Sequence, residues 1–167
     1  MILKRIFAIA AVAVLMLTSA CSITKEVEAN AVPIAFTEMN NYYVKNGVNT
    51  NKPLRKIINT ESEFRAIFGE AAYMGSNGSP TPINFNRQFV LAVVNPVTNR
   101  QTQMFPLSVL QNGKAIIFNY QVEKGAKMDY YISPYVAVVL DRPTTDATFE
   151  IYWNEKEQEE GSGWDVE

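Results

Sequence analysis

The chain has 167 residues, of which 47% are apolar and 19% are charged, with a formal net charge of −2 and no histidine. This length is enough for one domain with a core of ordinary size. A near-neutral charge without clustered Lys and Arg argues against nucleic-acid binding. The absence of histidine excludes Ser-His-Asp and Cys-His catalysis and every histidine-ligated metal site. We therefore expect neither a metal ion nor another cofactor.

The first twenty residues have the pattern of an export signal. Lys4 and Arg5 precede twelve uninterrupted apolar residues, 6–17, and the small residues 18–20 follow. A helix that spans a membrane needs about 20 apolar residues, so this segment is too short. A positive start, a short apolar core and small residues at its end are typical of a secretory signal. Residues 1–20 are therefore predicted to be removed on export.

Cys21, the only cysteine of the chain, directly follows this signal. The segment resembles the lipobox of bacterial lipoproteins, whose cysteine is acylated and becomes the N-terminus, although Thr18 stands where the usual pattern has Leu. The alternative is an ordinary secretory signal that leaves a free thiol. The resemblance implies several acyl chains on Cys21, and stable anchoring takes more than one. Ser22 then favours the outer membrane of a Gram-negative bacterium, on its periplasmic or cell-surface side.

The chain after the cysteine is predicted to hold one domain between two polar segments. Residues 21–33 are small or polar and are interpreted as a tether. A β-rich domain is expected over 34–154, with a strand at 34–46 that is irregular in its second half and a short strand at 54–59. The acidic residues 155–167 are expected to form a disordered tail. The tail has six acidic residues and one basic residue.

The pattern over residues 60–70 predicts the only convincing helix. Thr60 and Glu63 have the spacing of a capping box, in which each side chain accepts a hydrogen bond from the other residue's backbone N–H. Phe64, Ile67 and Phe68 fall on one helical face, and Gly69 is expected to end the helix. One apolar side on a short helix indicates packing against a sheet.

Strands recur in the second half of the chain. Residues 89–95 are apolar at both alternating positions, which predicts a central strand buried on both faces. Residues 102–110 contain Pro106, which indicates an edge or a bulge. The remaining strands are expected at 114–123, 128–140 with a bend at Pro134, and 147–154. Closely spaced strands with turns between them predict a mainly β fold, an antiparallel β-sandwich or barrel-like sheet with one short α-helix packed on it.

Two short loops have the sequences Asn-Pro-Val-Thr-Asn, residues 95–99, and Asp-Arg-Pro, residues 141–143. They resemble the loops of chagasin-type cysteine-protease inhibitors, small sandwiches that insert loops into a protease cleft. The usual glycine and aromatic residue after the first loop and the tryptophan after the second are absent. The resemblance implies partner binding by Asn95, Pro96, Thr98, Arg142 and Pro143. It requires both loops at the same end of the domain.

Three other groups allow a functional or a structural interpretation. Loop 74–82 exposes backbone amides that suit an anion or a partner, or it is a plain connector. Neighbouring aromatic residues suit a carbohydrate or peptide platform, or core and cross-strand packing; they are Tyr130, Tyr131, Tyr135, Tyr152 and Trp153. Three carboxylates suit acid–base catalysis or ordinary turns; they are Asp141, Asp146 and Glu150.

Residues 57–153 resemble the C-terminal domain family of the protease-complex subunit PrcB in their order of elements. A helix like 60–69 precedes a strand like 83–94, and a segment like 133–143 precedes a last strand. The Thr-Gly-Gly-Tyr turn usual in that family is replaced here by residues 95–104. The resemblance implies an accessory lipoprotein that supports a surface protease complex and has no catalytic activity. We therefore expect a non-enzymatic envelope protein, bound to the membrane through its lipid and to another envelope or surface protein.

Acylation can be tested directly. Because acyl chains on Cys21 add fatty-acid mass to the new N-terminus, mass spectrometry of the protein from its native host should find a heavier N-terminal fragment. A bare thiol at this position, in a protein that fractionates as soluble, would contradict the prediction.

Overall fold

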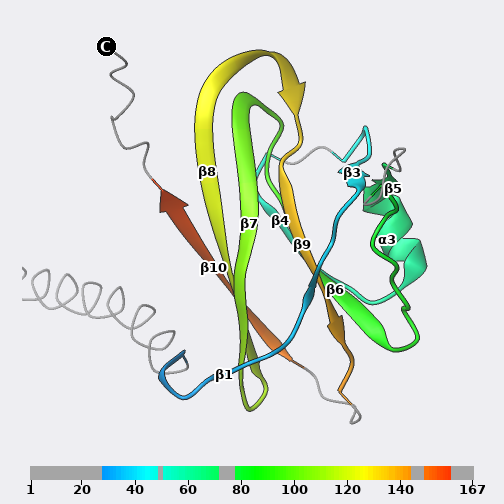
Figure 1. Ribbon diagram of the computed structural model, residues 1–167, viewed down its shortest axis with the longest axis vertical. Helices are drawn as coiled ribbons and strands as arrows, with labels where there is room; N and C mark the ends of the chain where they lie inside the picture. The colour runs from blue at the N-terminus through cyan, green and yellow to red at the C-terminus, as the bar shows by residue number, and fades with distance from the viewer. Residues whose placement is uncertain (1–27, 49–50, 72–77, 144–148, 159–167) are drawn as a thin grey trace, which may run out of the picture.

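The protein is a three-layered β-sandwich in the computed structural model, which describes residues 28–48, 51–71, 78–143 and 149–158 (Figure 1). One layer, the outer sheet, has the order β1-β7-β8-β10. Its strands are β1 (Val32–Pro33), β7 (Thr98–Asn112), β8 (Ala115–Ile132) and β10 (Glu150–Gln158). No helix within the described ranges is long and apolar enough to span a membrane.

The middle layer, the central sheet, is fully antiparallel with the order β2-β9-β6-β4. Its strands are β2 (Thr37–Glu38), β9 (Tyr135–Asp141), β6 (Gln88–Val94) and β4 (Leu54–Ile58). The third layer consists of the helix α3 (Glu61–Ile67) and a small sheet of β3 (Tyr42–Val44) and β5 (Phe68–Glu70). The predicted fold class, a mainly β sandwich with one short packed helix, is therefore confirmed.

Two apolar cores lie on opposite faces of the central sheet. Leu91 and Val138 point into the core shared with the outer sheet, and their neighbours Val90 and Val139 point into the core beneath α3. Successive side chains of a strand point to opposite faces, so both parities of β6 and β9 must be apolar. This confirms the prediction that residues 89–95 form a central strand buried on both sides.

The helix begins as the sequence predicts and ends earlier. Glu63 N donates to Thr60 Oγ1 over 3.2 Å, and Thr60 N donates to Glu63 Oε2 over 3.2 Å, which completes the capping box. Phe64 is buried against the central sheet. The helix stops at Ile67 because Phe68 adopts an extended conformation, with φ −111° and ψ 147°, and starts β5.

Gly69 is therefore a strand residue, and the prediction that it caps the helix is wrong. It lies directly opposite Tyr43 in the β3–β5 pair. A Cβ atom on Gly69 would lie 2.5 Å from Cζ of Tyr43, so any larger residue would force the ring to shift. An aromatic ring that covers a cross-strand glycine restores contact area that the glycine lacks.

The two long strands of the outer sheet are irregular. Their pairing shifts register between Pro106 and Ser108, in agreement with the bulge predicted at Pro106. Residues 114–123 and the first part of 128–140 join into the single strand β8, which ends at Ile132. Pro134 separates β8 from β9, as predicted, and the chain crosses there from the outer to the central sheet.

β10 departs from the expected pattern in two ways. It pairs parallel to β8, because β9 returns through the central sheet and brings the chain back to the end where β8 starts. It also continues to Gln158, four residues into the predicted tail. The expectation that disorder begins at residue 155 is wrong for these residues, because Glu155 accepts a hydrogen bond from buried Tyr120 over 2.9 Å.

The start of the domain also differs from the prediction. Val32 and Pro33, assigned to the tether from the sequence, form β1 and pair with Gln111 and Leu110 of β7. Ile34 N then donates to Val109 O over 2.8 Å. The chain therefore joins the sandwich beside the β7–β8 turn at Gly113.

The fit between Gly69 and Tyr43 predicts coupled stability effects. Gly69→Ala forces the tyrosine ring aside and should lower the free energy of unfolding by about 1 kcal/mol, as overpacking does. In a Tyr43→Ala background the ring is gone, so the same change should cost nothing. Urea unfolding of the four variants measures this coupling. An equal cost of Gly69→Ala in both backgrounds would contradict the proposed contact.

Candidate functional site

The two loops predicted to form one binding site lie at opposite ends of the sandwich. β6 and β9 are antiparallel, with Gln88 opposite Asp141 at one end and Val94 opposite Tyr135 at the other. Asn95 follows Val94, whereas Arg142 follows Asp141. Seven paired residues separate the loops by about 20 Å, at 3.3 Å per residue. A two-loop inhibitor requires both loops at the same end of the domain, and this requirement is not met.

Arg142 is engaged inside the domain. Its Nη2 donates to Asn59 O over 2.7 Å, and its Nη1 donates to Asn59 Oδ1 over 3.1 Å. Asn59 directly precedes the capping residue of α3, so the guanidinium ties the end of β9 to the start of the helix. Pro143 is exposed next to it. These two hydrogen bonds give Arg142 a structural role within the domain.

At the other end, the predicted loop residues mostly make local contacts. Asn95 N donates to Pro134 O over 2.8 Å, and Thr98 Oγ1 accepts from Arg100 N over 3.1 Å. The side-chain oxygen Oδ1 of Asn95 is buried and has no hydrogen-bond partner within the described ranges. Pro96 is half-buried. Asn95, Pro96 and Thr98 thus shape this end rather than supply its exposed surface.

The exposed surface at this end comes from an insertion in β8. Thr98 pairs with Ile132 and Arg100 pairs with Lys127, so residues 128–131 lie opposite Asn99 alone. Such bulges redirect side chains out of the sheet pattern. Tyr130 and Tyr131 are 58% and 71% exposed, and Val97 on the neighbouring loop is 49% exposed. We call residues 95–98 and 128–132 the tyrosine tip.

The flank of the tyrosine tip is basic. Arg100, Lys124 and Lys127 lie on the paired segments of β7 and β8, and the acids Glu123 and Asp129 lie on the same stretch of β8. Arg100 also donates from Nη1 to Gly125 O over 3.3 Å, which holds the two strands together where their register shifts. Exposed tyrosine and arginine are both enriched at protein interfaces, which are surrounded by a polar rim.

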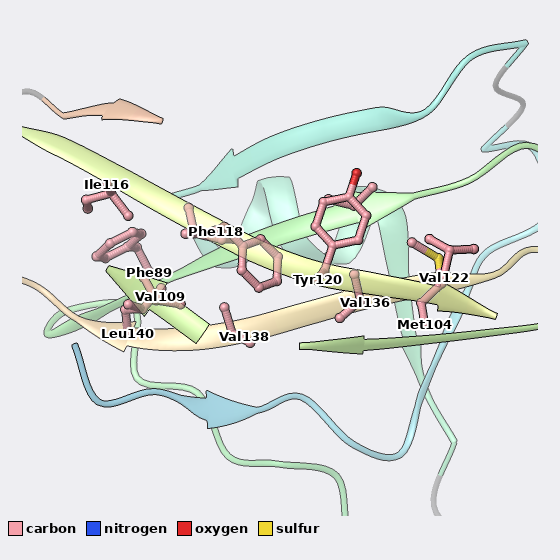
Figure 2. Close-up of a cluster of buried hydrophobic side chains, with 12 residues drawn as sticks. Phe89, Met104, Val109, Ile116, Phe118, Tyr120, Val122, Val136, Val138 and Leu140 are labelled. Atoms are coloured by element: carbon pink, nitrogen blue, oxygen red, sulfur yellow. The ribbon is translucent and has the colours of Figure 1, made fainter. Parts of the chain in front are cut away.

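The other aromatic residues considered from the sequence serve packing. Trp153 crosses Phe118 edge-on in the core, with ring centroids 6.0 Å apart (Figure 2 shows Phe118 in this cluster). Tyr135 is half-buried and donates its hydroxyl to Tyr42 O over 2.8 Å; burial raises its pKa, so it stays a neutral donor. Tyr152 points outward and donates to Glu150 over 3.3 Å. Only Tyr130 and Tyr131 remain as candidates for a platform.

A polar cluster that no local sequence pattern reveals joins the central sheet to the outer sheet. Arg55 of β4 donates to the hydroxyl oxygen of Tyr120 over 3.3 Å, and Tyr120 donates to Glu155 of β10 over 2.9 Å. Figure 2 shows the Tyr120 ring within the core and its oxygen directed away from it. Burial raises the pKa of Tyr120, which keeps it protonated. The cluster therefore acts as a fixed link between the sheets.

A groove of about 910 Å³ lies in the third layer, between α3, β3, β5 and residues 80–86. Aromatic rings of Phe64 and Phe85 contact one another beneath it. Its charges are mostly satisfied internally: Arg65 pairs with Glu61 over 2.7 Å, and Lys45 donates to Arg65 O. Tyr42 donates to Thr81 O over 2.8 Å, and burial raises its pKa. These contacts hold residues 80–86 against β3 and leave few polar groups of the groove available for catalysis.

The remaining sequence candidates are structural or lie outside the described residues. Ser79 O accepts from the Asn41 side chain over 2.8 Å, so the described end of loop 74–82 is held by the segment before β3, while residues 72–77 lie outside the description. Asp141 accepts from Gln88 over 3.1 Å, and Asp146 lies outside the description. No group of three or more potential metal ligands occurs within the described ranges.

Comparisons with known proteins add no further constraint. No family model matches the chain, and no curated protein or solved structure matches it significantly. The resemblance over residues 57–153 therefore stays a prediction. The candidate site rests on the geometry of the tyrosine tip alone.

The structural role of Arg142 can be separated from a binding role. Arg142→Ala removes two charge-assisted hydrogen bonds and should lower the free energy of unfolding by about 1–2 kcal/mol. Arg142→Lys keeps the charge but loses the bidentate geometry. It should therefore lower the free energy of unfolding by a smaller but still measurable amount. Chemical denaturation of both variants measures these effects. An unchanged stability for Arg142→Ala would show that the contact with Asn59 contributes nothing.

Proposed function

We propose that this protein is a lipid-anchored envelope protein that binds another protein through the tyrosine tip and has no catalytic activity. The lipid on Cys21 holds it at a membrane, the outer membrane of a Gram-negative bacterium being the location that the sequence favours. The domain then serves as an accessory or binding module, in line with the role that the resemblance to the PrcB family implies.

The observation that carries this proposal is the position of the tyrosine tip relative to the start of the domain. β1 pairs with β7 beside the β7–β8 turn. Tyr130 and Tyr131 lie at the opposite end of the 18-residue strand β8. Anchor and partner surface therefore do not compete for the same end of the sandwich.

The chemistry of the tip supports a protein partner. Tyrosine offers a large, fairly rigid apolar face together with a hydroxyl group that can form a hydrogen bond when the interface buries it. It is also enriched among the residues that dominate binding energy. Arg100 and Lys127 at the flank favour a partner with acidic groups. The rest of the described surface has no comparable pair of adjacent exposed aromatic residues.

The non-enzymatic part of the proposal is supported by how the polar side chains are used. The tyrosines with raised pKa values donate hydrogen bonds to neighbouring groups, and the groove's arginine pairs with a glutamate. A two-loop protease inhibitor is not proposed, because its loops lie at opposite ends.

Site-specific crosslinking in intact cells tests the partner surface. A benzophenone amino acid at position 131 should give a discrete adduct with one protein after illumination. The same probe at position 32, which is also exposed but lies at the opposite end, is the matched control and should not give that adduct. Identical adducts from both positions, or none from position 131, would rule out the tip as the binding surface.

A second variant ties binding to the tyrosine side chains. With the probe moved to position 97, Tyr130→Ala/Tyr131→Ala should reduce the adduct by about tenfold or more, as the loss of a dominant interface residue does. Both side chains are exposed, so the fold should be unaffected, which circular dichroism checks. An undiminished adduct would show that the tyrosines do not contribute.

A further inference from the structure

The two large sheets differ in how their edge strands are protected. An edge strand presents unpaired N–H and C=O groups that can pair with another chain, and proteins usually block it with short length, proline, bulges or charge. Here β1 and β2 have only two residues each, and β1 contains Pro33. β4 is five residues long and carries Arg55 and Lys56.

The part of β7 that extends beyond β1 is protected by irregularity. Beyond the residues that β1 covers, it contains Pro106 and three shifts of register against β8. Proline lacks the N–H that pairing requires, and bulges twist an edge away from a flat partner. A second chain cannot easily add to this edge.

β10 lacks each of these protections except charge. It forms nine consecutive pairs with β8 without a register shift, and it contains neither proline nor glycine. No strand within the described ranges pairs with its other edge. β10 is therefore the longest regular edge among the described strands, and its charges decide which strand can join it.

We propose that β10 pairs with β10 of a second copy of this chain, antiparallel and centred on Trp153, which joins the two outer sheets. In this register Glu150 lies opposite Lys156 of the second copy, and Lys156 lies opposite Glu150. Both side chains are exposed and share the outward face with Tyr152 and Asn154. Tyr152 of each copy then lies opposite Asn154 of the other copy.

The charges select this register over its alternatives. Parallel pairing in register places Glu150 against Glu150 and Lys156 against Lys156, and like charges directly opposite each other destabilise a strand pair. A register centred on Asn154 places Lys156 opposite Tyr152 and loses both ion pairs. Only the arrangement centred on Trp153 matches opposite charges twice within residues 150–156.

The dimer does not depend on the proposed function and is compatible with it. A twofold axis through an antiparallel strand pair directs the two tyrosine tips away from each other, so both remain open. An isologous contact of this kind closes with two copies and does not propagate.

Charge reversal with rescue tests the pairing. The purified full chain, kept in detergent, should sediment as a dimer. Glu150→Lys should place lysine opposite Lys156, and Lys156→Glu should place glutamate opposite Glu150, each weakening dimerisation by about tenfold. The double variant Glu150→Lys/Lys156→Glu restores both ion pairs and should dimerise like the native chain.

The control is Lys52→Glu, which changes the net charge as Lys156→Glu does but lies on an exposed segment outside the sheets. It should leave dimerisation unchanged, and circular dichroism should report the native fold for all variants. A native chain that stays monomeric, single reversals without effect, or a double variant that is not rescued would each overturn the proposal.

Discussion

The central sheet is buried on both faces, and the other layers depend on it. β6 and β9 send alternate side chains into two separate cores, one shared with the outer sheet and one beneath α3. Neither core can form without this sheet, because it contributes side chains to both. Burial of apolar area supplies most of the free energy that opposes chain entropy. The protein reaches this burial without disulfides, since the chain has a single cysteine.

The elements that could be predicted are those whose pattern is local. Apolar residues at both parities identified 89–95 as a central strand, and the spacing of Thr60 and Glu63 located the start of the helix within one residue. Pro134 and Pro106 marked a strand break and a bulge, because proline cannot donate to a ladder. In each case a few adjacent residues carry the whole signal.

The features that could not be predicted depend on strand order. The distance between residues 95–99 and 141–143 follows from β6 pairing antiparallel with β9, which no local pattern reveals. The parallel pairing of β10 depends on β9 lying in the other sheet. Gly69 was misassigned because its role is set by Tyr43 across the β3–β5 pair rather than by the helix before it. Acidic composition also concealed that residues 155–158 continue a strand.

The tyrosine tip illustrates how an irregularity can produce a surface. In a regular ladder, Tyr130 and Tyr131 would point to opposite faces of the outer sheet. Here residues 128–131 lie opposite Asn99 alone, three residues more than a regular ladder would place there, and both tyrosine side chains are exposed. Meanwhile Tyr120, which pairs with Pro106 beside another register shift, is fully buried and joins β4 to β10 through Arg55 and Glu155. The same residue type thus links two sheets at one position and is exposed to solvent at another.

The parallel arrangement of β10 also constrains the order of assembly. Trp153 covers Phe118, which comes 35 positions earlier, and β10 is the only described strand on that side of β8. Until residues 150–158 have been synthesised, this flank of the core stays open to water. The outer sheet can therefore close over Phe118 only late in synthesis, after the other described strands are already available.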